Sequence, residues 1–151
     1  MRPTVEEQLL GTCRILEKVV SPCVADPYAR TILEGLIGNL RMLTGALPAV
    51  PGFLNSDNRA TAGLLGQLQA VVAPDLAASI ALALGRPEPD AADMTALEQR
   101  NCELRELFSK ALCGPGLTPE MRAAALEHMS ARAARSPMRY VPTTSPPAKA
   151  T

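Results

Sequence analysis

Apolar residues recur at three- and four-residue spacing along the first 135 residues of the chain, which is the periodicity of α-helices that bury one side. The clearest segment begins at Asp26-Pro27, where the aspartate suits the N-cap and the proline suits the first helical position. Leucine, isoleucine and tyrosine side chains then share one face as far as Leu47, and Arg30, Glu34 and Arg41 fall on the opposite face. No segment alternates apolar and polar residues as a strand does. The sequence therefore predicts an all-α protein.

Residues that start and stop helices divide the chain into six helical segments. We expect the first to begin at Thr4, where Glu7 completes a capping box, and to end at Ser21-Pro22. The third is expected to begin at Ser56 or Asp57, after an apolar loop over residues 45–55. The last three are expected to run from 76 to 84, from Asp93 to the Gly-Pro-Gly turn at 114–116, and from 118 to 135.

These segments predict one domain over residues 1–135, an antiparallel helical bundle of about four long helices plus one or two short ones. Residues 136–151 are rich in Pro, Ser, Thr and Ala, and are expected to form a disordered tail. Aromatic residues make up only 3% of the chain, so the core must consist of aliphatic side chains. The helix over 76–84 is apolar on nearly every side, which predicts a central position or a subunit interface.

The charge balance excludes several classes of partner. Fifteen lysines and arginines match fifteen aspartates and glutamates, and no basic patch with interleaved aromatic residues is present, so nucleic-acid binding is not expected. No apolar run reaches the ~18 residues of a membrane span. The chain opens without a secretory signal, and its four cysteines lack the CxxC spacing of a zinc site. We expect a soluble cytoplasmic protein without a metal or other cofactor.

Catalytic patterns are also missing from the sequence. A nucleophile-base system would depend on His128, the single histidine, which we expect to be solvated near the end of the last helix, where its charge suits the helix dipole. The Glu-x-x-His motif of di-iron bundles needs a second histidine, and no glycine-rich phosphate loop is present. No catalytic or metal-binding residue is assigned.

Three polar residues fall within apolar helical faces: Asn39 on the second helix, and Arg100 and Asn101 on the fifth. A buried polar group needs partners, and Asp57 is a candidate. One interpretation is a structural network that fixes helix register. The other is a pocket in which these four residues and Tyr28 bind an acyl or carboxylate ligand.

The segment Arg2-Pro3-Thr4-Val5-Glu6-Glu7-Gln8-Leu9-Leu10, together with Val20-Ser21-Pro22, resembles the start of a family of small uncharacterised bacterial helical proteins. These proteins are encoded beside, or fused to, aminoglycoside-phosphotransferase-like kinases, often near acyl-CoA dehydrogenases. The Asp26–Arg30 segment and the helix containing Asn39 are similar to that family's second helix. The resemblance extends to about residue 45 and implies an accessory role near phosphotransferase or acyl-CoA metabolism. It assigns no site residue.

Two functions remain open. The first is an accessory protein, not an enzyme, that binds a protein partner or a second copy of itself through an apolar helical face, with helix 76–84 and the loop 45–55 as the candidate surfaces. The alternative is a small-molecule-binding bundle that uses the inward polar residues.

Overall fold

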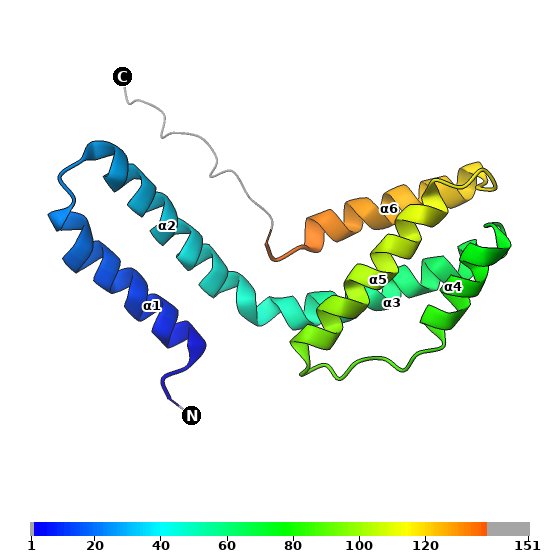
Figure 1. Ribbon diagram of the computed structural model, residues 1–151, viewed down its shortest axis with the longest axis horizontal. Helices are drawn as coiled ribbons and strands as arrows, with labels where there is room; N and C mark the ends of the chain where they lie inside the picture. The colour runs from blue at the N-terminus through cyan, green and yellow to red at the C-terminus, as the bar shows by residue number, and fades with distance from the viewer. Residues whose placement is uncertain (1, 139–151) are drawn as a thin grey trace, which may run out of the picture.

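The computed structural model describes residues 2–138, and every regular element among them is helical (Figure 1). The α-helices are α1 (Val5–Ile15), α2 (Pro27–Ala46), α3 (Val50–Leu68), α4 (Pro74–Leu84), α5 (Met94–Leu112) and α6 (Pro119–Arg135). A π-helical segment, Leu16–Val20, and a 3₁₀ turn, Ser21–Cys23, extend α1. The prediction of an all-α protein is confirmed. Residues 136–138 follow α6 without helical structure, and the rest of the predicted tail lies outside the described residues.

Capping residues fix four of the helix starts as predicted. The hydroxyl of Thr4 accepts from the Glu7 backbone N–H at 3.1 Å, and the Glu7 carboxylate accepts from the Thr4 N–H at 2.8 Å. Asp26, Asp93 and Thr118 cap α2, α5 and α6 by accepting from the backbone N–H three residues ahead. Each cap stabilises its helix by about 1 kcal/mol.

The prediction of a loop over residues 45–55 is wrong. α2 continues to Ala46, a 3₁₀ turn covers Leu47–Ala49, and α3 begins at Val50. Pro48 and Pro51 lie in the first turns of these two helical segments, where a backbone N–H has no helical partner to lose. Asp57 therefore lies inside α3 and is fully buried; it does not cap the helix.

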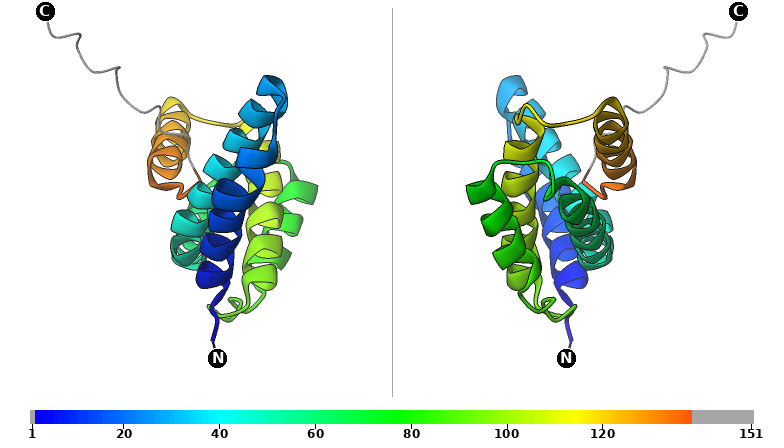
Figure 2. Two further views of the ribbon diagram at one scale, coloured as in Figure 1. Left: turned by 90° about the vertical axis from the view of Figure 1, so that its left-hand side faces the viewer. Right: turned by 90° about the vertical axis from the view of Figure 1, so that its right-hand side faces the viewer.

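The helices form a projecting hairpin and a four-helix unit. α1 packs on α2, and α2 leads through the 3₁₀ turn almost directly into α3 (Figure 1). In the four-helix unit, α3 and α5 make the most extensive contact, and α4 and α6 lie on opposite sides of this pair (Figure 2). Among the described residues, none of the helices has both the length and the apolar character needed to cross a membrane.

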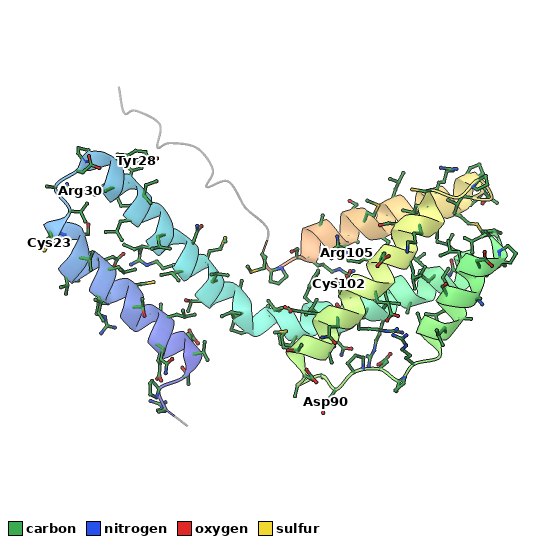
Figure 3. All side chains as sticks on the ribbon, in the orientation of Figure 1. Cys23, Tyr28, Arg30, Asp90, Cys102 and Arg105 are labelled. Atoms are coloured by element: carbon green, nitrogen blue, oxygen red, sulfur yellow. The ribbon has the colours of Figure 1, made fainter. Side chains whose placement is uncertain are left out.

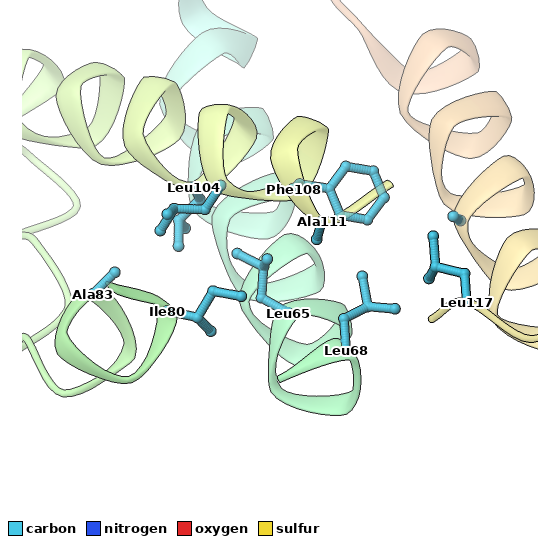
Figure 4. Close-up of a cluster of buried hydrophobic side chains, with 10 residues drawn as sticks. Leu65, Leu68, Ile80, Ala83, Leu104, Phe108, Ala111 and Leu117 are labelled. Carbon is cyan, nitrogen blue, oxygen red and sulfur yellow. The ribbon is translucent and has the colours of Figure 1, made fainter. Parts of the chain in front are cut away.

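The main core lies between α3, α4, α5 and α6 and is almost entirely aliphatic, as the composition predicts (Figure 4). Its buried members are Leu65, Leu68, Ile80, Ala83, Leu104, Leu107, Phe108, Ala111, Leu117 and Ala125. α4 does not occupy a central position. It buries Ile80 and Ala83 against this core, whereas Leu82 on its other side is 66% exposed.

Candidate functional site

Two of the five predicted site residues, Asp57 and Asn101, meet in the interior of the four-helix unit. The side-chain amide of Asn101 on α5 donates to Asp57 Oδ2 at 2.7 Å and to Asn58 Oδ1 at 2.8 Å. All three side chains are buried, and Asp57 has no exposed surface. Asn58 in turn donates to the backbone carbonyl of Leu97 at 3.1 Å, so the cluster joins α3 to α5.

Arg132 on α6 completes this polar cluster. Arg132 was not identified as a site residue from the sequence. Its Nε donates to Asp57 Oδ2 at 2.8 Å, and its Nη2 is 3.5 Å from Asn101 Oδ1. The Arg132 side chain is 26% exposed, so it joins the buried carboxylate to the surface. The second Asp57 oxygen, Oδ1, is buried and accepts no hydrogen bond from the described residues. Three helices distant in sequence are thus held in register by one carboxylate.

His128 is only partly exposed and packs inward, contrary to the sequence prediction of a solvated residue. Its Nε2 lies 3.1 Å from the hydroxyl of Thr61, and its ring packs edge-on against Phe108 with 5.5 Å between ring centroids. Burial lowers the pKa of His128 below its ordinary value, with a further lowering from Arg132 and Arg135; Asp57 opposes this shift. The prediction failed because the side of α6 that faces α3 and α5 carries His128 and Arg132 together with the buried Ala125.

Arg100 lies beside this cluster and does not join it. Its guanidinium is 3.3 Å from Glu103, and its side chain is only 11% exposed. With Asn58 and Leu97 it lines a cleft between α3 and α5, at whose rim Arg59 and Glu88 form an ion pair of 2.8 Å. The cleft has a volume of about 30 Å³, far below the roughly 300–1,000 Å³ of typical ligand pockets.

Tyr28 and Asn39 lie on α2, in the hairpin, and both are exposed. Tyr28 is 76% exposed at the outer end of the hairpin, whereas Cys102 and Arg105 on α5 mark the four-helix unit (Figure 3). The five predicted residues therefore do not line a common site. The apolar face that contains Asn39, predicted to be buried, is largely uncovered.

The hairpin instead carries an extended apolar surface. We call the six most exposed of its large apolar side chains the hairpin surface; they are Val5, Ile15, Val19, Tyr28, Ile32 and Leu36, exposed by 49–76%. Along α2 they recur every four residues and form one continuous stripe. The hairpin's own interior is small, since its buried residues are Cys13, Ile37, Thr44 and Ala46.

Charged side chains of the hairpin gather away from the α2 stripe. Glu17 forms an ion pair with Arg41, and these two residues line shallow grooves together with Arg14, Lys18 and Glu34. Because Arg30, Glu34 and Arg41 lie opposite the stripe on α2, the hairpin has a charged side and an apolar side.

Within residues 2–138, no three Cys, His, Asp or Glu side chains are grouped so that they could hold a metal ion. The four cysteines are free, and Cys13 alone among them is buried. Comparison of the chain with protein-family models, with curated proteins and with solved structures gives no match.

Proposed function

We propose that this chain is an accessory protein that binds a protein partner through the hairpin surface on α1 and α2. The observation that carries the proposal is the concentration of uncovered apolar side chains there. Among the described residues, ten of the fourteen large exposed hydrophobic side chains lie between Val5 and Leu47. Scattered exposed leucines are ordinary on any protein, whereas a contiguous patch rimmed by charge is typical of an interaction site.

The proposed surface differs from the two that the sequence favoured. The helix predicted over 76–84 already packs one side on the core and leaves Leu82 as its large exposed side chain. The segment 45–55 joins α2 to α3, and its Ala46 and Leu54 are buried. The hairpin surface, in contrast, covers two helices.

The resemblance to small proteins encoded beside kinases covers the residues that build this hairpin. It supports an accessory role in the cytoplasm, near phosphotransferase or acyl-CoA metabolism. The free cysteines suit a reducing compartment. In this proposal the antiparallel helical bundle expected from the sequence is completed when a partner's helices cover α1 and α2.

A photo-crosslinking amino acid, p-benzoyl-phenylalanine, placed at position 32 tests the proposal in living cells. Ile32 is 57% exposed on the α2 stripe, and Leu126, 67% exposed on α6, is the matched control position. We expect a covalent adduct with a protein from position 32 and none from position 126. If positions 28, 32 and 36 all fail to crosslink to any polypeptide, the proposal is wrong.

A second candidate is the binding of a small carboxylate or acyl ligand at the Arg100 cleft. The nearly buried guanidinium of Arg100, beside the amide of Asn58, favours it. The cleft must widen to accept such a ligand. Thermal-shift measurements with free carboxylic acids and acyl-CoAs test it: a ligand that raises the melting temperature of the native chain and not that of Arg100→Met supports the site, and no shift with any of them removes it.

A further inference from the structure

We infer that the hairpin surface binds a second copy of the same chain, so that two α1–α2 hairpins pack into one four-helix bundle. This inference rests on the proposed function and names its partner. Four features carry it: the size of the uncovered surface, its lack of charge, the balance of charge around it, and an open glycine position on α2.

The hairpin surface is large enough for a dimer. α2 contains 20 residues, which corresponds to a length of about 30 Å, and two helices side by side are about 20 Å wide. The projected area is therefore about 500–600 Å², and side-chain relief raises its accessible area towards the roughly 800 Å² per partner of a standard interface. A partner with a single short helix would cover only part of it.

The surface has no charge that would repel its own copy. In a two-fold dimer the same patch meets itself, so every charge on it would face a like charge nearby. The α2 stripe at Tyr28, Ile32 and Leu36 contains no charged residue between these positions on the same face. Asn39 continues this stripe as a neutral polar group, which can hydrogen-bond to its own counterpart.

The charges outside the surface are also balanced, which disfavours a strongly charged partner. Residues 2–46 contain five basic and five acidic side chains: Arg2, Arg14, Lys18, Arg30 and Arg41 against Glu6, Glu7, Glu17, Asp26 and Glu34. An acidic or basic peptide, or an anionic lipid surface, would gain no net attraction from this hairpin. A copy of the same hairpin matches it without a charge penalty.

The backbone of α2 also permits close packing. A Cβ added at Gly35, which lies beside the stripe on the helical wheel, would meet no atom within 4 Å, so this position is open to an approaching helix. Helices that meet at small residues approach closely, and apolar side chains on either side then interdigitate. Two such hairpins form the antiparallel, two-fold arrangement of a four-helix bundle.

Light scattering coupled to size-exclusion chromatography tests the inference on the full-length purified chain. We expect a mass of twice 15.9 kDa for the native protein. Ile32→Asp and Leu36→Asp place a charge in the dimer interface, and each is expected to give a monomer. Leu126→Asp, at an exposed leucine on α6, is expected to leave the dimer intact.

Two measurements keep the test decisive if a charged variant unfolds. The melting temperature of the native dimer must rise with protein concentration, because dissociation accompanies unfolding. The purified chain with p-benzoyl-phenylalanine at position 32 must yield a covalent dimer under illumination. Neither measurement requires an aspartate in the hairpin surface, so neither depends on how well the charged variants fold.

Other results overturn the inference. A native chain that is monomeric at about 100 µM, with a melting temperature independent of concentration, has no self-association of the expected strength. A dimer that survives both Ile32→Asp and Leu36→Asp uses another surface. A position-32 crosslink to residues 139–151 of the same chain identifies the tail as the occupant. A monomeric chain that crosslinks to a different protein in cells rejects the second copy and retains the proposed function.

Discussion

Arg132→Met removes the guanidinium that donates to a carboxylate with no exposed surface. In the native protein Asp57 Oδ2 accepts from Arg132 Nε at 2.8 Å and from Asn101 Nδ2 at 2.7 Å. Asp57 Oδ1 has no partner among the described residues. Methionine has nearly the volume and helix propensity of arginine, so the change leaves α6 in place and leaves the charge on Asp57 with one hydrogen bond.

The expected loss of stability follows from this geometry. Removing one partner of a fully buried ion pair costs about 3–5 kcal/mol, because the remaining charge is left uncompensated. Arg132 is 26% exposed, so water can reach the position that it vacates, and we expect the lower end of this range, about 3 kcal/mol. With a urea dependence of about 1–3 kcal/mol per molar, the midpoint of unfolding falls by about 1–3 M. Helical circular dichroism at fixed protein concentration measures this midpoint.

Arg135→Met is the matched control, since Arg135 lies on the same helix end and its Nε donates within α6 to the carbonyl of Ala131 at 3.2 Å. It should lose at most about 0.3–1 kcal/mol from the helix dipole. Adding Asp57→Asn to Arg132→Met should restore part of the stability, because it removes the buried charge. The reasoning is refuted if Arg132→Met loses no more than Arg135→Met, or if the double variant is no more stable than Arg132→Met alone.

Three further predictions concern the same four-helix unit. Burial lowers the pKa of His128 below 6.5, so as the pH falls the unfolded chain binds the proton before the folded chain does. The free energy of unfolding is therefore highest above about pH 6.5 and decreases below it. His128→Gln should reduce this decrease in urea titrations from pH 5 to 7. A Cβ at Gly116 would collide with the carbonyl oxygen of Val71, whereas one at Gly52 meets nothing within 4 Å; Gly116→Ala should destabilise by about 1–3 kcal/mol and Gly52→Ala should stabilise by about 0.5–1 kcal/mol, in opposite shifts of the melting temperature. Leu65 is fully buried in the aliphatic core, so Leu65→Ala should cost about 2–5 kcal/mol in urea unfolding, and a loss below about 1 kcal/mol would contradict the core assignment.

Local chemistry explains which parts of the fold were predictable. A cap depends on a side chain and a backbone N–H three residues ahead, so Thr4, Asp26, Asp93 and Thr118 could be identified from short sequence windows. Proline is ambiguous at this range, because the same residue ends one helix and begins another. Pro48 and Pro51 were interpreted as a loop, and they lie in the first turns of the 3₁₀ segment and of α3.

The polar cluster was only half predictable, because its contacts join distant segments. Asn101 was identified by its place among apolar residues on α5, and Asp57 was named as its partner. Arg132 lies 75 residues from Asp57 in sequence, on the helix where the neighbouring His128 was expected to be solvated. Helical periodicity shows which residues share a face of a helix. It does not show whether a buried carboxylate on another helix pairs with a polar side chain on that face and so places the face inward.

The width of an apolar helical face reflects how many neighbours the helix has, and α2 and α5 differ in this respect. α5 packs on both α3 and α4, and it buries Leu97, Leu104, Leu107, Phe108 and Ala111. α2 has a comparably wide apolar face, but in the hairpin α1 covers only the part around Ile37. A helix that uses one neighbour needs only a narrow stripe, and the second stripe at Tyr28, Ile32 and Leu36 is the face that the proposed partner would cover. The sequence predicts that this stripe is buried, whereas the stripe is exposed in the single chain. The two agree if another chain covers the stripe.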